Sequence, residues 1–131
     1  MAEVLVAPDP LLLARAWLLR YFPRVEVGVP DKWAWNDLLI VLSNTGGPGE
    51  YDRVLSESRL TVEVTHPRIA TASDAAFKCL ALLQEWTRQT DGVYWRGEYG
   101  HPAYQPTDTG PAYIFTVGIA FKSKPVTINP L

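Results

Sequence analysis

The stretch "RLTVEVT" (Arg59–Thr65) alternates strictly between apolar and polar residues. Successive side chains of a strand point to opposite faces, so the apolar residues Leu60, Val62 and Val64 would share one face. The pattern predicts a strand with one face in the core, and Pro67 would end it.

A second strand and a glycine-rich segment precede this stretch. The run "DLLIVLS" (Asp37–Ser43) is continuously apolar, which favours a central strand buried on both faces. The segment "NTGGPGEYDR" (44–53) then lacks the Lys and the following helix that a phosphate-binding loop needs. Pro48 also removes one amide donor, and acidic side chains in the segment would repel a phosphate. We therefore predict a long loop between two paired strands.

Downstream, apolar residues recur at intervals of three and four: Ala76, Cys79, Leu80, Leu83 and Trp86. This spacing predicts an amphipathic helix, with Thr71 or Ser73 as its cap, Asp74 in its first turn, and its end at Asp91-Gly92.

Two further strands are expected after this helix, over "VYWRGEYG" (93–100) and "AYIFTVGIAFK" (112–122). A loop with several proline and glycine residues would separate them: Pro102, Pro106, Gly110 and Pro111. In the last strand Gly118 interrupts the face opposite the apolar side chains, so it indicates a bulge or a close approach.

The first helix is expected to begin at Asp9-Pro10 and to run through "LLLARAWLLRYF" (11–22). Almost its whole circumference is apolar, whereas a small domain covers only one stripe of a helix. Either some apolar side chains are tolerated in water or another subunit covers them. We favour the second interpretation and place Leu13 and Trp17 in a subunit contact. A short strand at Val25–Val29 would follow.

The order helix, strands, helix, strands predicts an α+β fold. In this fold a mostly antiparallel or mixed sheet carries two helices packed on one face. The 131 residues fit a single domain, with an ordered core at about residues 7–122 and a C-terminal arm at 123–131.

Composition excludes several classes of protein. The net charge of -2 leaves no basic excess for binding nucleic acid phosphates. The single Cys79 allows no internal disulfide and fits a reducing compartment. The chain shows no signal peptide and no apolar run of the roughly 20 residues that a membrane span needs. We expect a soluble, cytosolic domain with no membrane partner.

Residues with catalytic or metal-binding chemistry are few. Cys79 lies on the apolar stripe of the second helix, where a buried hydrophobic role is expected. The two histidines, His66 and His101, each precede a proline, and no partners stand at metal-ligand spacing. Glu98 and Asp108 could meet in space, as many surface pairs could. We expect no cofactor, no metal and no enzyme activity.

Aromatic residues outside the helices give a stronger signal, because tryptophan and tyrosine are enriched at protein interfaces. They are Trp33, Trp35, Tyr94, Trp95, Tyr99 and Tyr104. Two interpretations remain open: these side chains close the ends of the core, or they form an interface.

The order of these features resembles a known family. The chain begins with a capped helix, a "VEVGV" strand and a strand leading to "TGG". It continues with "RLTVEV", an alanine-containing helix and, after "GHPAYQPTDTG", the stretch "GPAYIFTVGIAF". This order is similar to tail terminator proteins of long-tailed bacteriophages, especially those of actinobacteria, over roughly Ala7–Lys122. The family often has further arginines around the Gly-Gly, whereas this chain has "SN" before "TGG" and "PGEY" after it.

The resemblance implies a structural function without chemistry. Tail terminators form a six-fold ring on the last ring of the tail tube, stop its polymerisation and form the joint to the head. The implied partners are further copies of the chain, the major tail tube protein and a head–tail neck or stopper protein. DNA would only pass through the channel. The protein would be assembled in the host cytoplasm and reside in the virion at the head–tail junction.

Within this interpretation the glycine-rich segment becomes a contact arm that projects from the sheet toward the tube or the channel. Its residues are Gly46, Gly47, Glu50, Asp52 and Arg53. The loop residues Trp33 and Trp35 would lie at an interface.

Two alternatives are kept. One is another neck component, a head–tail stopper or adaptor. The other, from a different class, is a small-ligand-binding or hydrolytic α+β domain with a pocket near His66, Glu98 and His101.

Overall fold

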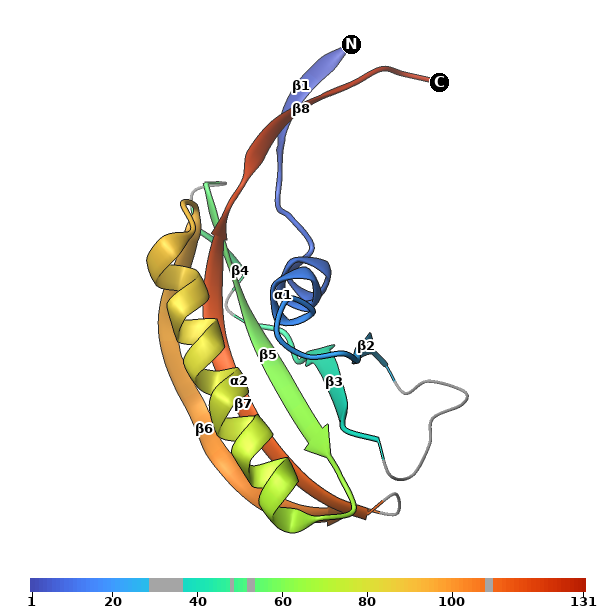
Figure 1. Ribbon diagram of the computed structural model, residues 1–131. Helices are drawn as coiled ribbons and strands as arrows, with labels where there is room; N and C mark the ends of the chain where they lie inside the picture. The colour runs from blue at the N-terminus through green and yellow to red at the C-terminus, as the bar shows by residue number, and fades with distance from the viewer. Residues whose placement is uncertain (29–36, 48, 52–53, 108–109) are drawn as a thin grey trace.

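In the described part of the chain, the β-structure consists of a six-stranded mixed sheet and a separate two-stranded ribbon, and two helices pack against the larger sheet (Figure 1). The chain is therefore an α+β protein, as the sequence predicts. The computed structural model describes residues 1–28, 37–47, 49–51, 54–107 and 110–131. The elements in chain order are β1 (Ala2–Val6), α1 (Pro10–Leu18), β2 (Val25–Val27), β3 (Leu39–Asn44), β4 (Gly49–Tyr51), β5 (Leu55–Thr65), α2 (Ile69–Gln89), β6 (Val93–Thr107), β7 (Gly110–Lys122) and β8 (Lys124–Ile128).

The larger sheet has the strand order β2-β3-β5-β7-β6, and the short β4 also pairs with β5. Among the described strands, β2 and β3 are parallel and the other pairs are antiparallel. Strand β5 is central because it pairs with β7 along its whole length and with β3 and β4 along its other edge. The predicted pairing of the strands on either side of the glycine-rich segment is thus confirmed.

The core lies between this sheet and the two helices. The alternation that predicts β5 is confirmed, because Leu60, Val62 and Val64 are fully buried on the helix side. Strand β7 adds Phe115 and Val117 beside them. In β3 two consecutive residues, Leu39 and Ile40, are both buried, so the start of this strand is covered on both faces.

Helix α2 buries the predicted stripe, but it begins earlier than the sequence indicates. Its first residue is Ile69, so the expected caps Thr71 and Ser73 lie inside the helix and Asp74 lies beyond its first turn. No side chain caps the first turn of α2. Instead the His66 ring Nδ1 accepts a hydrogen bond from the backbone N–H of Arg68 at 3.0 Å, which fixes the chain just before the helix. The His66 ring, three residues before the first helical residue, thus holds the N-cap residue Arg68 in place.

The predicted loop between the last two strands is wrong. Strands β6 and β7 continue through it as one long hairpin, in which Pro106 lies opposite Pro111. Because β6 is an edge strand and Pro111 lies at the start of β7, neither proline removes a necessary donor from the centre of the sheet. Three register shifts in β6 also absorb its irregular sequence.

Gly118 is expected to mark a bulge or a close approach, and the structure shows both. A register shift in β6 lies directly opposite Gly118, where Gly97 pairs with it. A Cβ atom at position 118 would lie 2.6 Å from Cε2 of Tyr99. The missing side chain therefore makes room for the Tyr99 ring on the face of the sheet away from the helices.

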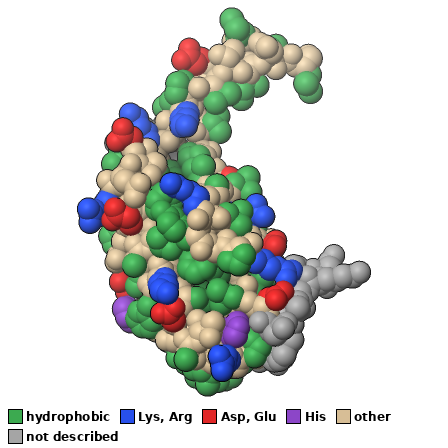
Figure 2. Space-filling model, viewed as in Figure 1, with side chains coloured by type: hydrophobic (Ala, Val, Ile, Leu, Met, Phe, Trp, Pro, Cys, Tyr) green, Lys and Arg blue, Asp and Glu red, His purple; other side chains and the backbone are tan. Residues whose placement is uncertain are grey.

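Both ends of the chain lie in a ribbon that extends away from the helices (Figures 1 and 2). The residues of β1 and of β8, which lies in the C-terminal arm, are exposed, so neither strand has a face in the core. The sequence does not predict that this arm pairs with residues 2–6 in an antiparallel register, with Val4 opposite Val126. Strand β2 ends at Val27, and Val29 of its predicted range lies outside the described residues.

Candidate functional site

Helix α1 begins as the sequence predicts and ends earlier. The Asp9 carboxylate accepts a hydrogen bond from the backbone N–H of Leu11 at 2.9 Å, and Pro10 is the first helical residue. The helix ends at Leu18 and not at Phe22. Tyr21 donates its N–H to the Leu18 carbonyl at 3.0 Å, a tighter three-residue bond that closes the helix.

The inner side of α1 belongs to the core. Trp17 is only 5 % exposed, donates its indole N–H to the carbonyl of Leu82 at 2.9 Å and stacks on Trp86 with ring centroids 6.4 Å apart. The sequence interpretation that places Trp17 directly in a subunit contact therefore needs correction. The helix is apolar on almost its whole circumference, so its pattern does not reveal which side faces the sheet. Trp17 holds α1 against α2.

The opposite side of α1 is apolar and uncovered. We call it the outer face of α1; its residues are Leu12, Leu13, Ala16 and Leu19. Leu12 is 60 %, Leu13 40 % and Leu19 38 % exposed. Spacings of four and three bring side chains onto one side of a helix, so these residues form a continuous patch. The structure thus leaves Leu13 available for contact, and its predicted role in a subunit contact stays a prediction.

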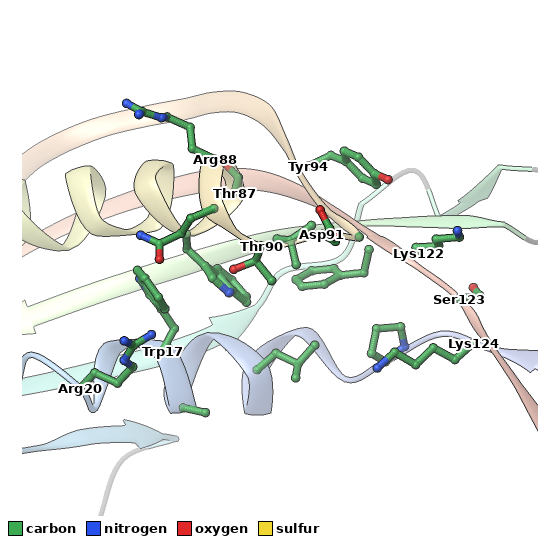
Figure 3. A pocket seen from close by; sticks show the side chains of 18 of the residues that line it. Trp17, Arg20, Thr87, Arg88, Thr90, Asp91, Tyr94, Lys122, Ser123 and Lys124 are labelled. Carbon is green, nitrogen blue, oxygen red and sulfur yellow. The ribbon is translucent and has the colours of Figure 1, made fainter.

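A groove adjoins the outer face of α1 (Figure 3). It has a volume of about 1230 Å³ and runs between α1, the end of α2 and the start of the ribbon. Leu13, Ala16 and Trp17 form its wall on the α1 side. Its charged lining residues are mostly cationic: Arg20, Arg88, Lys122 and Lys124, with Asp91 as the acidic one. The groove therefore combines apolar walls with a positive rim.

Two of these cations have interactions within the subunit. The Arg20 guanidinium lies over the Trp17 ring, 4.8 Å from its centroid, and Arg88 forms an ion pair with Glu85 at 3.5 Å. Both contacts are made at the protein surface, where such pairs stabilise a fold only weakly. The cations are therefore available to an acidic partner at little cost.

The glycine-rich segment does not stand away from the sheet over its described residues. Thr45 donates its N–H to the Arg59 carbonyl at 2.9 Å, and the Gly46 carbonyl accepts from the Arg59 N–H. Gly47 passes so close to β5 that a Cβ there would lie 2.6 Å from the Glu57 carbonyl. Strand β4 then pairs with β5. The expectation of a projecting arm is corrected for this part, because the segment is bonded to β5.

The remaining predicted residues of that segment are only partly described. Glu50 lies in β4 with its backbone opposite Ser56. Asp52 and Arg53 lie outside the described residues, as do Trp33 and Trp35. Their proposed contacts remain predictions.

A polar cluster on the sheet face away from the helices was not foreseen. Glu57 is 4 % exposed and accepts hydrogen bonds from Arg96 Nε at 2.9 Å and from the Tyr99 hydroxyl at 3.4 Å. Arg59 lies over the Tyr99 ring, 4.1 Å from its centroid. Gly118 is the sequence signal that could have revealed it, since the gap at this position admits the ring. The cluster joins β5 to β6 across β7 and neutralises a buried carboxylate.

The other loop aromatics divide between the two interpretations that the sequence left open. Trp95 is partly buried and packs against the core. Tyr94, Tyr99 and Tyr104 are 46 %, 48 % and 47 % exposed. Of these, Tyr104 packs on Tyr113 with ring centroids 5.8 Å apart.

The histidines each engage a different neighbour. His101 Nδ1 lies 2.9 Å from Glu98 Oε2 at an exposed position, and the Phe77 ring packs beside the imidazole at 5.2 Å. His66 accepts the Arg68 amide at the start of α2. Asp108, the other acidic residue considered beside Glu98, lies outside the described residues. The pair His101–Glu98 is thus an exposed surface contact, and neither residue lines the groove beside α1.

The described residues show neither a metal site nor a membrane-spanning helix. Within residues 1–28, 37–47, 49–51, 54–107 and 110–131, no group of three or more His, Cys, Asp and Glu side chains could hold a metal ion. Neither described helix combines the length and the apolarity needed to cross a lipid bilayer. Comparison of the sequence with protein family models and with curated proteins found no match. The outer face of α1 with its groove therefore stands as the candidate site on geometry alone.

Proposed function

We propose that this chain is a structural ring subunit of the tail terminator type and not an enzyme. In this role it would cap the tail tube of a long-tailed bacteriophage, stop tube polymerisation and form the joint to the head. The order of sequence features suggests the family, and the observation that carries the proposal is the outer face of α1. Leu12 is 60 % exposed there, next to two further exposed leucines.

A closed ring needs two different surfaces on each subunit, because one face of a subunit meets another face of its neighbour. The outer face of α1 fits one of these surfaces. Its apolar side chains would become the centre of a contact, and the cationic groove beside it would form the polar rim that such interfaces have. No reacting group is required at either place.

In the proposed ring, the segment at residues 46–53 would face the tube or the channel. Its acidic residues Glu50 and Asp52 suit a channel wall, since like charge keeps passing DNA from binding. The tail tube protein and a neck protein would be the partners on the two sides of the ring.

The test combines electron microscopy with one matched pair of variants. Purified protein is mixed with tail tubes assembled from the tube protein of the same source, and free tube subunits are added. We expect rings at the tube ends and no further growth. Leu13→Asp should abolish both, because a charge at the contact centre must be desolvated. Phe77→Asp is the control, since Phe77 is 43 % exposed on α2 and Leu13 is 40 % exposed on α1.

Two results would count against the proposal. Tubes that keep growing in the presence of the protein would exclude the proposed terminator function. Binding to tailless heads instead of tube ends would favour the alternative of a neck stopper or adaptor, which is also a ring protein without enzyme activity.

A further inference from the structure

The ribbon of β1 and β8 has one apolar face. Directly opposed residues of an antiparallel pair share a face, so the register places five apolar side chains together. They are Ala2, Val4 and Val6 of β1 and Val126 and Ile128 of β8, and Lys124, opposite Val6, lies at the base of the same face. Val4 is 37 %, Val126 41 % and Ile128 52 % exposed. We call this set the ribbon's apolar face.

A ribbon of this kind is not expected to be stable by itself. A two-stranded antiparallel pair is marginal in water unless a hydrophobic face is covered. Its own subunit does not cover it, since the ribbon points away from the helices (Figure 1) and the space-filling view shows hydrophobic side chains along it (Figure 2). Another molecule must therefore supply the cover.

The β6 edge of the large sheet is a poor receptor for the ribbon. Register shifts between Trp95 and Gly97, Glu98 and Gly100, and Gly100 and Ala103 interrupt this strand. Bulges and prolines of this kind protect edge strands from pairing with other chains. The outer face of α1 has no such protection.

We propose that the ribbon's apolar face of one subunit packs on the outer face of α1 of a second copy of this chain. The lengths agree, because five strand residues span about 17 Å and the nine residues of α1 span about 14 Å. Both faces are apolar and both are uncovered within one subunit.

The charges at the ends select one orientation. Asp9 lies at the N-terminal end of α1 and Arg20 just beyond its C-terminal end. On the ribbon, Lys124 lies at the base and shares the apolar face with Val6, whereas Glu3 lies on the other face with Thr127. With the base of the ribbon at Asp9, Lys124 lies next to an opposite charge. The reverse orientation places Lys124 next to Arg20, a like charge.

This inference rests on the proposed ring function and adds the contact that builds the ring. Each subunit gives one ribbon and receives one, so the contact is heterologous and can propagate around a closed ring. The adjoining cationic groove lies next to the docked ribbon.

Disulfide trapping between two single variants tests the contact and its orientation together. Ile128→Cys and Leu19→Cys are purified separately, mixed in equal amounts at high concentration and oxidised. The orientation brings the ribbon tip next to Leu19, so we expect the mixed dimer to be the main product. The native Cys79 does not compete, because burial raises the pKa of its thiol to about 12 and keeps it protonated.

Two controls make the result specific. Thr127→Cys lies on the other face of the ribbon and should give at least tenfold less mixed dimer with Leu19→Cys. Ile128→Cys with Leu12→Cys probes the wrong end of α1 and should also give little. Equal yields in these mixtures, disulfides mainly between two Ile128→Cys chains, or no disulfide at all would each overturn the proposed contact.

The two proposals can fail separately. Rings on tube ends without the Ile128–Leu19 disulfide would support the terminator function and exclude this contact. The disulfide without any effect on tube growth would support the contact and exclude the terminator function.

Discussion

The two helices lie on the same sheet but use their apolar residues differently. Helix α2 buries one stripe of its 21 residues and directs its charges outward, where Asp74 and Lys78 form an ion pair at 2.8 Å. Helix α1 buries three of its nine residues and leaves leucines on its other side, with Leu12 60 % exposed. The fold accounts for the sequence of α2 but not for the outer face of α1.

This difference separates residues that stabilise the subunit from residues whose presence the fold of the subunit does not explain. An exposed leucine gains little from folding, because its apolar surface stays in water. Single exposed apolar residues are common, whereas a contiguous patch beside a groove marks an interaction surface. The ribbon's apolar face, which both ends of the chain form, is likewise uncovered within the subunit.

The largest expected effect tests the buried side of α2. Leu83 is fully buried in the core, so Leu83→Ala should lower the free energy of unfolding by about 2–5 kcal/mol through lost burial and a residual cavity. Urea denaturation followed by circular dichroism measures it. A loss below about 1 kcal/mol would mean that α2 is packed as loosely as the outer face of α1, and the comparison would not hold.

A pH series tests the same buried side through its thiol. Burial raises the pKa of Cys79 from 9.0 to about 12. Above pH 9 the unfolded chain loses this proton while the folded chain keeps it, so the unfolded state is favoured. The stability of the native protein relative to Cys79→Ala should be constant below pH 9 and should fall by up to about 1.4 kcal/mol per pH unit as pH rises from 9 toward 12.

Denaturation curves of both proteins at pH 8, 9 and 10 give this difference, and titrations of the lysines and tyrosines cancel in the comparison. A difference that is unchanged at pH 10 would place the thiol in contact with water. The apolar stripe of α2 would then be more accessible to water than the burial of the residues around Cys79 indicates.

The elements that could be predicted from the sequence have local patterns. The alternation of Leu60, Val62 and Val64 and the spacing of Cys79 and Leu83 each repeat within a few residues, so period alone identifies strand β5 and helix α2. The excess of apolar residues on α1 is likewise a local pattern, and the subunit leaves Leu12, Leu13 and Leu19 exposed. Those patterns give the layers of the fold.

The features that could not be predicted depend on distant partners. The pairing of Val4 with Val126 joins the two ends of the chain, and no local signal reports it. Pro102 and Pro106 indicate a loop, yet an edge strand tolerates them because its outer donors need no partner in the sheet. The choice of Trp17 as a surface contact failed because an all-apolar helix does not tell its inner side from its outer side.

The smallest expected change in stability gives the sharpest test of the comparison between the helices. Leu12→Ser removes the most exposed leucine of α1, so the free energy of unfolding should change by less than about 0.5 kcal/mol. Association should weaken markedly, as measured by sedimentation velocity across a concentration series, because the apolar contact would now include a hydroxyl.

The stability and the association measurements together show whether Leu12 serves the fold of its own subunit or the contact with another one. A loss of stability as large as that of Leu83→Ala would make Leu12 part of the subunit fold. Unchanged association would show that the outer face of α1 is not the contact. Only unchanged stability together with weakened association fits a leucine that serves the assembly, because burial in the neighbour and not burial in its own core would then account for its presence.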